Sequence, residues 1–381
     1  MTPRLTIVMP MKGRHLFTFR FLWHANKARL PYRFLLADGL VNEAVARRLE
    51  DSRKGFPELD IEYVRYPDDT DYSRYFVKMS DAMQRVRTPY VMLADNDDFL
   101  GFNGIEWALD FLDTHEDYVC SRGHQLGFSV YSGIGEKAGS IFGKFNRFLL
   151  DSDYKEFDAP TAAERLRQGG LCHRLHYAIW RTAGPARIMQ EIAEINFSDL
   201  MLYEDFFALR ALTLGKAHLD NATISYYSQS GTGVSYQPLR DWARHLLRSR
   251  FTSDVHAAVE RISLAVADDA TIAEDVRGIL ERRYRAFLSN NYGTLAQIKR
   301  TLRNKWPRVA QHVQTRPRFS VRRERAAILS QLHGAGASEQ DLKRICGELA
   351  EIACVLSPAV FADYAGPLLP IARADAGREW L

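Results

Sequence analysis

Hydrophobic and polar positions follow two alternating patterns over about the first 235 residues. Four short apolar runs predict buried strands, the first of them ended by Pro10. They are Leu5–Met9, Tyr32–Ala37, Ile61–Tyr66 and Tyr90–Ala94. Between them lie three longer segments of helical composition: Leu16–Ala28, Asn42–Ser52 and Ser73–Arg87. Strands separated by helices predict an α/β fold with a mostly parallel sheet and helices on both of its faces.

From about Gln237 the pattern becomes helical throughout. The segments that favour helix are Asp241–Arg261, Thr271–Leu288, Leu295–Arg303, Arg322–Leu332 and Ser338–Leu356. The last of them opens with an N-cap-like serine and early acidic residues. The chain is long enough for two domains, so we expect an α/β domain at 1–236 and a helical C-terminal domain at 237–381.

Composition narrows the class of protein. The 381 residues are 46% hydrophobic, which supports a buried core and excludes a disordered chain. With 51 basic and 47 acidic residues the net charge is +4, too small to indicate a nucleic-acid binder. The four cysteines show no C-x-x-C spacing. No run approaches the roughly 20 apolar residues of a membrane span, and the expected location is the cytoplasm.

Three carboxylates follow the fourth predicted strand within four residues: Asp95, Asp97 and Asp98. In open α/β sheets, ligands bind beyond the carboxyl ends of the strands. Clustered like charges need a compensating cation, and carboxylate oxygens suit Mg²⁺ or Mn²⁺, which take further ligands from substrate phosphates. The pattern therefore favours a metal–diphosphate site. The plainer alternative is a solvated turn that caps the next helix.

Further motifs accompany this acidic segment in a fixed order. They are Val8–Arg14 and Leu35–Gly39 at strand ends, Tyr75–Met83, and Met201–Arg210 with its Glu204-Asp205 pair. Together they resemble the family 2 glycosyltransferases of the GT-A fold, of the bacterial surface-polysaccharide type. The resemblance covers about residues 4–235. It implies a Rossmann-like GT-A domain, a nucleotide-sugar donor with UDP favoured, Mn²⁺ or Mg²⁺, and a glycan or lipid-linked acceptor.

The resemblance also implies a role for individual residues. Pro10 and Arg14 would shape the nucleotide pocket, and Lys12 and Gly13 would allow close approach of the base or ribose. Asp38 would accept a hydrogen bond from the base edge, and Lys78 would lie near the nucleotide or its phosphates. Asp97 would bind the metal most directly, with Asp95 beside it near the ribose or sugar. Asp205 would be the general base and Glu204 would orient the sugar or acceptor.

The chemistry of sugar transfer agrees with the last assignment. Transfer with inversion needs a base for the acceptor hydroxyl and positive charge for the departing diphosphate. We expect the Glu204-Asp205 pair at a helix start, where the helix dipole would lower the pKa of Asp205. The alternative is an ordinary acidic first turn that complements the dipole.

The histidines depart from the family pattern. Many such enzymes have a histidine metal ligand after the E-D helix, whereas the segment Tyr226–Ser235 contains none. Gln229 or Ser230 there is the candidate contact to the diphosphate, and the alternative is that the loop closes as a flexible Gly/Ser lid. His218, in an apparent strand, is interpreted as structural. His173 and His176 form an H-x-x-H pair that we interpret as acceptor-side rather than metal-binding.

A basic stretch follows in the helical region. Residues 282–325 contain thirteen Lys or Arg and one acid, Glu324. A peripheral contact with the inner face of a membrane or an anionic acceptor is the preferred functional interpretation, and no nucleic acid is expected. The alternative is a solvated helix face packed on the first domain.

The favoured function is nucleotide-sugar-dependent glycosyl transfer in surface polysaccharide or glycoconjugate synthesis. Two rivals stay open: a sugar nucleotidyltransferase, and a non-catalytic glycan- or nucleic-acid-binding module on the same kind of sheet. A nucleotidyltransferase would want a glycine-rich loop after the first strand, which Met9–Arg14 does not provide. The segment Gly123–Pro160 is the expected source of acceptor selectivity.

Overall fold

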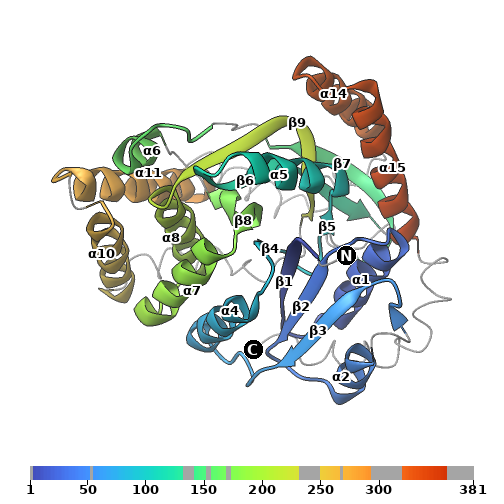
Figure 1. The fold of residues 1–381 in the computed structure, drawn as a ribbon, viewed down its shortest axis with the longest axis horizontal. Coiled ribbons are helices and arrows are strands. Elements are labelled where there is room, and N and C mark those ends of the chain that lie inside the picture. Colours follow the sequence, from blue (N-terminus) through green and yellow to red (C-terminus); the bar gives the residue numbers. More distant parts are fainter. Residues whose placement is uncertain are drawn as a thin grey trace, which may run out of the picture.

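A nine-stranded sheet organises the computed structural model (Figure 1). The structure describes residues 3–51, 55–131, 141–151, 156–168, 173–230, 249–266, 269–292 and 320–357. The strands are β1 (Leu5–Met11), β2 (Arg33–Asp38), β3 (Asp60–Arg65), β4 (Tyr90–Leu93), β5 (Phe99–Leu100), β6 (Tyr118–Tyr131), β7 (Lys144–Leu150), β8 (Ile179–Arg181) and β9 (Lys216–Gln229). The main path runs β3-β2-β1-β4-β8-β6-β9-β5, and β7 pairs with β6.

Helices connect these strands and extend the chain beyond them. They are α1 (His15–Lys27), α2 (Glu43–Glu50), α4 (Tyr72–Arg85), α5 (Phe102–Thr114), α6 (Ala162–Gln168), the 3₁₀ helix η1 (His173–Tyr177), α7 (Ala183–Ile195), α8 (Leu200–Leu212), α10 (Ser249–Leu264), α11 (Ile272–Tyr292), α14 (Ser320–Gly334) and α15 (Glu339–Val355). Ser338 caps α15 with a reciprocal Asp341 capping box, as the sequence predicts. The predicted helix at 295–303 lies outside the described residues.

Strands β3, β2, β1 and β4 are mutually parallel, and the predicted α/β class is confirmed. The predicted end of the first strand is wrong, because β1 continues through Pro10 to Met11. Val8 O accepts from Ala94 N on the β4 side and Met11 O accepts from Gly39 N on the β2 side. The backbone nitrogen of Pro10 therefore points toward the β4 side of the strand, beyond the point where the pairing with β4 ends. Because none of the described strands lies there to accept a hydrogen bond, the missing N–H of Pro10 costs the sheet none.

Alternation along the strands divides the core into two layers. In β1, Val8 joins a cluster with α4, α7, α8, α10 and α11, whereas Ile7 and Met9 join a cluster with α1, α2 and α5. In β4, Val91 and Met92 divide in the same way. Successive strand residues point to opposite faces, so apolar runs without polar alternation are buried on both sides. The predicted helices on both faces are confirmed (Figure 1).

The C-terminal helices pack into the same clusters as the first part of the chain. Helices α10 and α11 contribute Phe251, Val276 and Tyr284 to the cluster that holds α7 and α8. Helices α14 and α15 cover β5, β6, β7 and β9 through a third cluster. The expected boundary at 236/237 lies outside the described residues, and the division into 1–236 and 237–381 stays a prediction.

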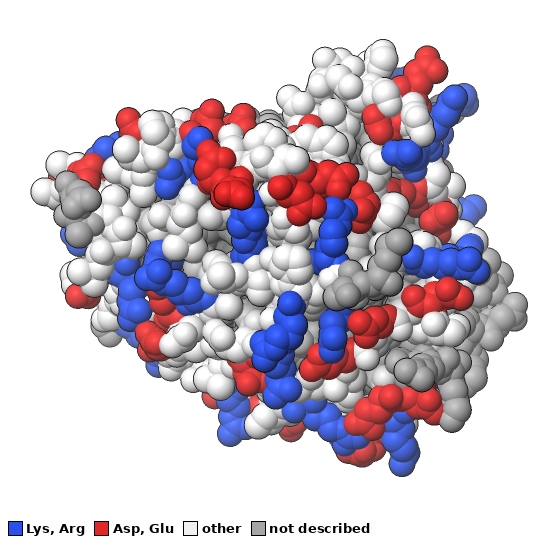
Figure 2. Space-filling view, in the orientation of Figure 1, with Lys and Arg blue, Asp and Glu red and all other residues white. Residues whose placement is uncertain are grey.

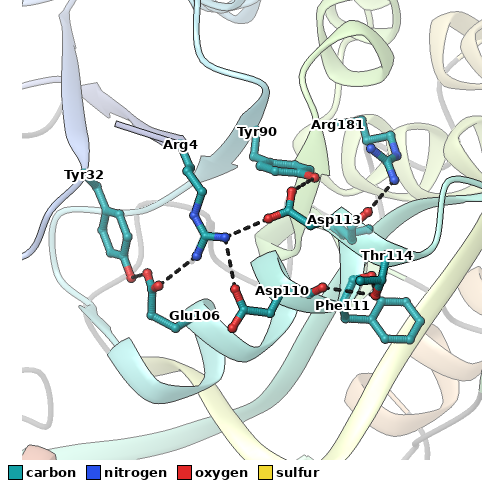
Figure 3. A network of polar contacts seen from close by, with 10 residues as sticks. Arg4, Tyr32, Tyr90, Glu106, Asp110, Phe111, Asp113, Thr114 and Arg181 are labelled. Carbon is teal, nitrogen blue, oxygen red and sulfur yellow. Dashed lines mark hydrogen bonds and ion pairs between the residues drawn. The ribbon is translucent and has the colours of Figure 1, made fainter. Parts of the chain in front are cut away.

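Arg4, just before β1, ties the sheet to α5 (Figure 3). Its guanidinium donates to Glu106 (2.9 Å), Asp110 (3.0 Å) and Asp113 (2.7 Å). Tyr32, just before β2, donates its hydroxyl to Glu106. Exposed ion pairs contribute little individually, but this network orients α5, whose N-terminus follows the acidic segment of the sequence.

The surface carries both signs of charge. On the face shown in Figure 2, basic and acidic side chains are interspersed, in keeping with the small net charge. Within the part of the chain that the structure describes, no helix is both long and apolar enough to cross a membrane.

Candidate functional site

The three carboxylates after β4 form a compact group, named here the acidic loop (Asp95, Asp97 and Asp98). One oxygen of each lies within 4.8 Å of the others, and among the described residues this is the one group of at least three potential ligand side chains. Asp97 and Asp98 are buried and Asp95 is half-buried. The site residues Asp95 and Asp97 are therefore brought together, and Asp98, which the sequence left without a role, joins them.

Two tyrosines and one backbone amide hold the acidic loop in place. Tyr177 donates to Asp95 Oδ2 (2.6 Å), and Asp95 N donates to the Tyr226 hydroxyl (2.9 Å). The two tyrosine rings stack with centroids 4.6 Å apart. Asp98 Oδ1 accepts from Gln229 N (2.7 Å) at the end of β9. The loop is thus fixed from η1 and β9, which lie far away in the sequence.

Two arginines from the α1 region approach Asp97. Arg14, in the left-handed conformation at φ 53° as the N-cap of α1, pairs with Asp97 Oδ2 at 2.9 Å. Arg20 is fully buried and donates to the backbone oxygens of Asp97 (2.6 Å) and Ile141 (2.6 Å). Its guanidinium lies 4.8 Å from the ring centroids of Phe17 and Phe99. Sequence reasoning missed Arg20, although an arginine among the apolar residues of α1 is a signal that an internal partner exists.

Replacing Arg20 with Met should destabilise the fold and loosen the acidic loop. Two buried carbonyl oxygens would lose their donors, which costs about 2–4 kcal/mol in total. Chemical denaturation should show a lower midpoint than for the wild type, and Mn²⁺ should raise the melting temperature less. Arg47→Met, on the exposed face of α2, is the matched control and should leave both measurements unchanged. Equal stability of the Arg20 and Arg47 variants would contradict the assignment.

The acidic loop fits a hard divalent cation. Burial, and then the charge of Asp97, raises the pKa of Asp95 to about 6. Burial and the charges of Asp97 and Asp95 raise the pKa of Asp98 well above its ordinary value. A dication would relieve this repulsion, and all the ligand atoms are oxygens of the kind that Mg²⁺ and Mn²⁺ prefer.

The expected nucleotide residues lie at the ends of β1 and β2. Asp38, the last residue of β2, is fully buried and accepts from Tyr63 OH (2.6 Å) and Leu40 N (3.0 Å). Pro10 is half-buried near the end of β1, and Lys12 just after the strand is exposed. The structure therefore gathers these three residues at one edge of the sheet, next to Arg14.

Lys78 joins this edge through a residue that the sequence reasoning missed. Its ammonium forms a buried ion pair with Asp69 and donates to Met11 O (3.1 Å). Asp69 N in turn donates to Gly39 O (2.7 Å), and a Cβ on Gly39 would lie 2.3 Å from the Asp69 carboxyl group. The glycine of the Asp38-Gly39 motif is thus required by the close approach of Asp69.

The Glu204-Asp205 pair does not begin a helix, so that expectation is wrong. Helix α8 begins at Leu200, and its N-cap Asp199 accepts from Leu202 N (2.8 Å). Glu204 and Asp205 lie in the second turn, where the helix dipole is weak. The expected lowering of the Asp205 pKa is also wrong, since burial raises it to about 6 while Arg283 opposes the rise.

Glu204 and Asp205 meet different surroundings. Asp205 Oδ2 accepts from Arg283 Nε at 3.2 Å, and only 6% of its side chain is exposed. Glu204 is half-buried and feels the charge of Asp95. Burial, followed by Asp95 and Asp205, raises the pKa of Glu204 to about 8. At neutral pH Asp205 is mainly ionised and Glu204 mainly protonated, a division of states typical of paired catalytic carboxyl groups.

Two tyrosines lie close enough to Glu204 and to the acidic loop to feel the charges of both. Tyr75 and Tyr203 lie edge-to-face with centroids 6.1 Å apart, and each feels the charges of both Asp95 and Glu204. His176 packs edge-on against Tyr203 at 5.3 Å, and burial lowers its pKa to about 3. His176 is thus buried among aromatic rings, and the acceptor-side interpretation of the H-x-x-H pair stays a prediction.

The remaining sequence candidates are placed as follows. His218 lies in β9, stacks on Phe111 at 4.0 Å and bonds to Glu156 (2.6 Å), a structural set of contacts. Residues 231–235 of the expected diphosphate loop lie outside the described part of the chain. So do residues 293–319 of the basic stretch.

Comparisons with known proteins give structural similarity alone. No family model matches the sequence, and no curated protein matches it. The chain is similar to the crystal structure of S. aureus TarS 1-349, with 12% identity, a TM-score of 0.44 and coverage of 98% of this chain and 87% of that one. The crystal structure of S. aureus TarS 1-349 in complex with UDP is similar at 11% identity and a TM-score of 0.45, with coverage of 95% of this chain and 92% of that one. The mannosyltransferase PcManGT from Pyrobaculum calidifontis in complex with GDP-Man and Mn²⁺ is similar at 11% identity and a TM-score of 0.42, with coverage of 98% of this chain and 86% of that one. These identities and TM-scores are low.

Proposed function

We propose that this chain is a nucleotide-sugar-dependent glycosyltransferase of the GT-A type that transfers a sugar with inversion to a glycan or lipid-linked acceptor. The observation that carries the proposal is the acidic loop at the carboxyl end of β4, with a second carboxyl pair whose Glu204 feels the charge of Asp95. Diphosphate release and proton removal need two such centres. The ordered motifs of the sequence support the same proposal.

The donor would bind at the edge formed by β1 and β2. Asp38 keeps acceptor capacity for a base edge, because each of its oxygens takes one hydrogen bond from its own chain. Lys78, neutralised by Asp69, would lie near the nucleotide or its phosphates, with Pro10, Lys12 and Arg14 completing the pocket. The preference for a UDP-sugar rests on the resemblance of these motifs.

Asp97 and Asp95 would hold Mn²⁺ or Mg²⁺, with Asp98 as an additional oxygen ligand. When bound, the cation supplies positive charge for the leaving nucleoside diphosphate. Arg14, which pairs with Asp97, would share that carboxylate with the cation and also brings positive charge to the site. Tyr177 and Tyr226 fix the loop so that the ligand oxygens need little rearrangement.

Asp205 would act as the general base. It takes the proton of the acceptor hydroxyl while the acceptor oxygen bonds to C1 of the sugar and the C1–oxygen bond to the diphosphate breaks, its electron pair leaving with the nucleotide. Glu204, largely protonated at neutral pH, would orient the sugar or acceptor by hydrogen bonding. Peripheral membrane contact through 282–325 remains part of the proposal for a lipid-linked acceptor.

Nucleoside diphosphates should stabilise the protein in a manner that depends on the metal. At a hundredfold excess over its dissociation constant, a bound ligand adds about 2.7 kcal/mol to the free energy of unfolding. A thermal-shift panel of UDP, GDP and ADP with Mn²⁺ or Mg²⁺ should therefore show a rise for one base in particular. The absence of any metal-dependent shift would contradict the donor assignment.

The product then separates the proposal from its rival enzyme. Incubation with the matching nucleotide-sugar and Mn²⁺ should release the nucleoside diphosphate by slow hydrolysis. Release of pyrophosphate from a nucleoside triphosphate and a sugar phosphate would indicate a nucleotidyltransferase instead.

A further inference from the structure

Arg283 of α11 reaches the proposed catalytic pair from the C-terminal helices. Its Nε lies 3.2 Å from Asp205 Oδ2, and the two residues are 78 positions apart in the sequence. Only 18% of the Arg283 side chain is exposed, against 80% for Arg285 on the same helix. Arg283 therefore differs from its basic neighbours and does not belong to a solvated helix face.

The packing of α11 explains why this arginine points inward. Val276, Leu280 and Tyr284 recur at intervals of four and are buried in the cluster that includes α8. Helix α11 packs against α10 and α6 (Figure 1). Arg283 is next to Tyr284, so burial of that face carries the guanidinium toward Asp205.

Few charged groups share this environment with Asp205. Asp199 raises the pKa of Asp205 and Arg283 lowers it, and Glu204 and Tyr284 also feel the Asp205 charge. Other charged residues on the packed elements are engaged elsewhere: Glu191 of α7 binds Arg210 of α8, Asp254 of α10 binds Ser198, and Arg165 of α6 binds backbone carbonyls. His176 of η1 is neutral. Among the described residues, Arg283 is thus the cation that acts on Asp205.

We propose that Arg283 is a positioning residue for the transfer reaction: it holds the Asp205 carboxylate in one orientation and keeps it ionised against the burial of the site. This inference rests on the proposed function. It also makes α11 a component of the active centre rather than a separate appendage. The charged Nε–H group of Arg283 both orients the Asp205 carboxylate through a hydrogen bond and stabilises its negative charge. An exposed arginine of the same helix does neither.

The test compares pH profiles of kcat for the wild type, Arg283→Gln, Arg283→Lys and the control Arg285→Gln. Asp205 must be ionised to accept a proton, so activity falls as the pH drops through about 6. An opposite charge at this distance lowers a carboxyl pKa by about 1–3 units, so its loss moves the acid limb of Arg283→Gln upward by about one unit or more. Activity at pH 6 relative to pH 8 should fall about fivefold for a one-unit shift. The acid limbs of the Arg283→Lys and Arg285→Gln pH profiles should coincide with that of the wild type.

An acid limb of Arg283→Gln that coincides with the wild-type limb would overturn the inference, as would an equal shift in Arg285→Gln. If Arg283→Gln does not fold, Arg283→Lys decides. Its limb should stay in place while its kcat falls several-fold, because lysine keeps the charge but loses the Nε–H bond. A lysine variant with a wild-type kcat, or with an upward-shifted limb, overturns the proposal.

A second readout separates this inference from the proposed function. Carboxyl ¹³C NMR of aspartate-labelled protein, with Asp205→Asn for assignment, reports the titration of Asp205 without turnover. If the pKa of Asp205 rises in Arg283→Gln but the protein transfers no sugar, the proposed function is wrong and the electrostatic role of Arg283 is confirmed. If the protein transfers sugar but the pKa of Asp205 is unchanged in Arg283→Gln, the proposed function stands and the role of Arg283 is wrong.

Discussion

Asp97→Asn should abolish the response of the protein to divalent cations and reduce sugar transfer by about 100-fold or more. Asp97 is one of three carboxylates whose oxygens lie within 4.8 Å of one another, and its Oδ2 is already paired with Arg14. An amide in its place offers a weaker ligand oxygen and removes the carboxylate that pairs with Arg14. Calorimetric titration with Mn²⁺ and the Mn²⁺-dependent thermal shift measure the loss directly.

The matched control for this prediction is Asp110→Asn. Asp110 is an exposed carboxylate of α5 that pairs with Arg4 and lies outside the acidic loop (Figure 3). It should keep wild-type Mn²⁺ binding and activity. A wild-type Mn²⁺ affinity in Asp97→Asn would show that the acidic loop is not the metal site.

The strands around the acidic loop could be predicted because burial on both faces leaves continuous apolar runs. Tyr90–Leu93 is buried at every position, and its end places Asp95 and Asp97 where a ligand is expected. Local patterns therefore identified the loop and the E-D pair. The path of β1 beyond Pro10 could not be predicted, because it depends on where the neighbouring β4 ends.

The partners of the site residues could not be predicted, because they come from elsewhere in the chain. Arg20 contacts Asp97 across 77 residues, and Arg283 contacts Asp205 across 78. In the sequence, Arg283 is one of thirteen basic residues in a stretch that favours a surface role. The apolar spacing of Val276, Leu280 and Tyr284 indicates the buried face of the helix, but it does not indicate which carboxylate Arg283 meets there.

The error in the pKa of Asp205 has the same origin. A helix-start position predicts a lowered pKa through the dipole, whereas the carboxyl group lies in the second turn and is buried. Dipole effects fall off within the first turn, while burial acts on the charged form directly. Burial therefore decides the direction, and the same burial raises the pKa of Glu204 further.

Asp205→Asn should lower kcat by about 10²–10⁴-fold, the range typical of a lost general base. Binding of the nucleotide donor should be retained, because Asp205 is not one of the acidic-loop carboxylates and pairs with Arg283 instead. The residual activity should also lose the acid limb near pH 6, since the group that titrates there is gone. Steady-state kinetics between pH 5 and 9, with donor affinity measured separately, tests each part.

Glu204→Gln is the informative comparison, because it makes the same carboxyl-to-amide change one residue away. Glu204 has a pKa of about 8 and is mainly neutral at pH 7, so a neutral amide should preserve most of its hydrogen bonding and reduce kcat far less than Asp205→Asn. If Glu204→Gln is the inactive variant and Asp205→Asn retains its rate and its acid limb, then Glu204 is the base. Asp205 would then serve only to bind Arg283, since its carboxylate would hold α11 against α8 without receiving a proton.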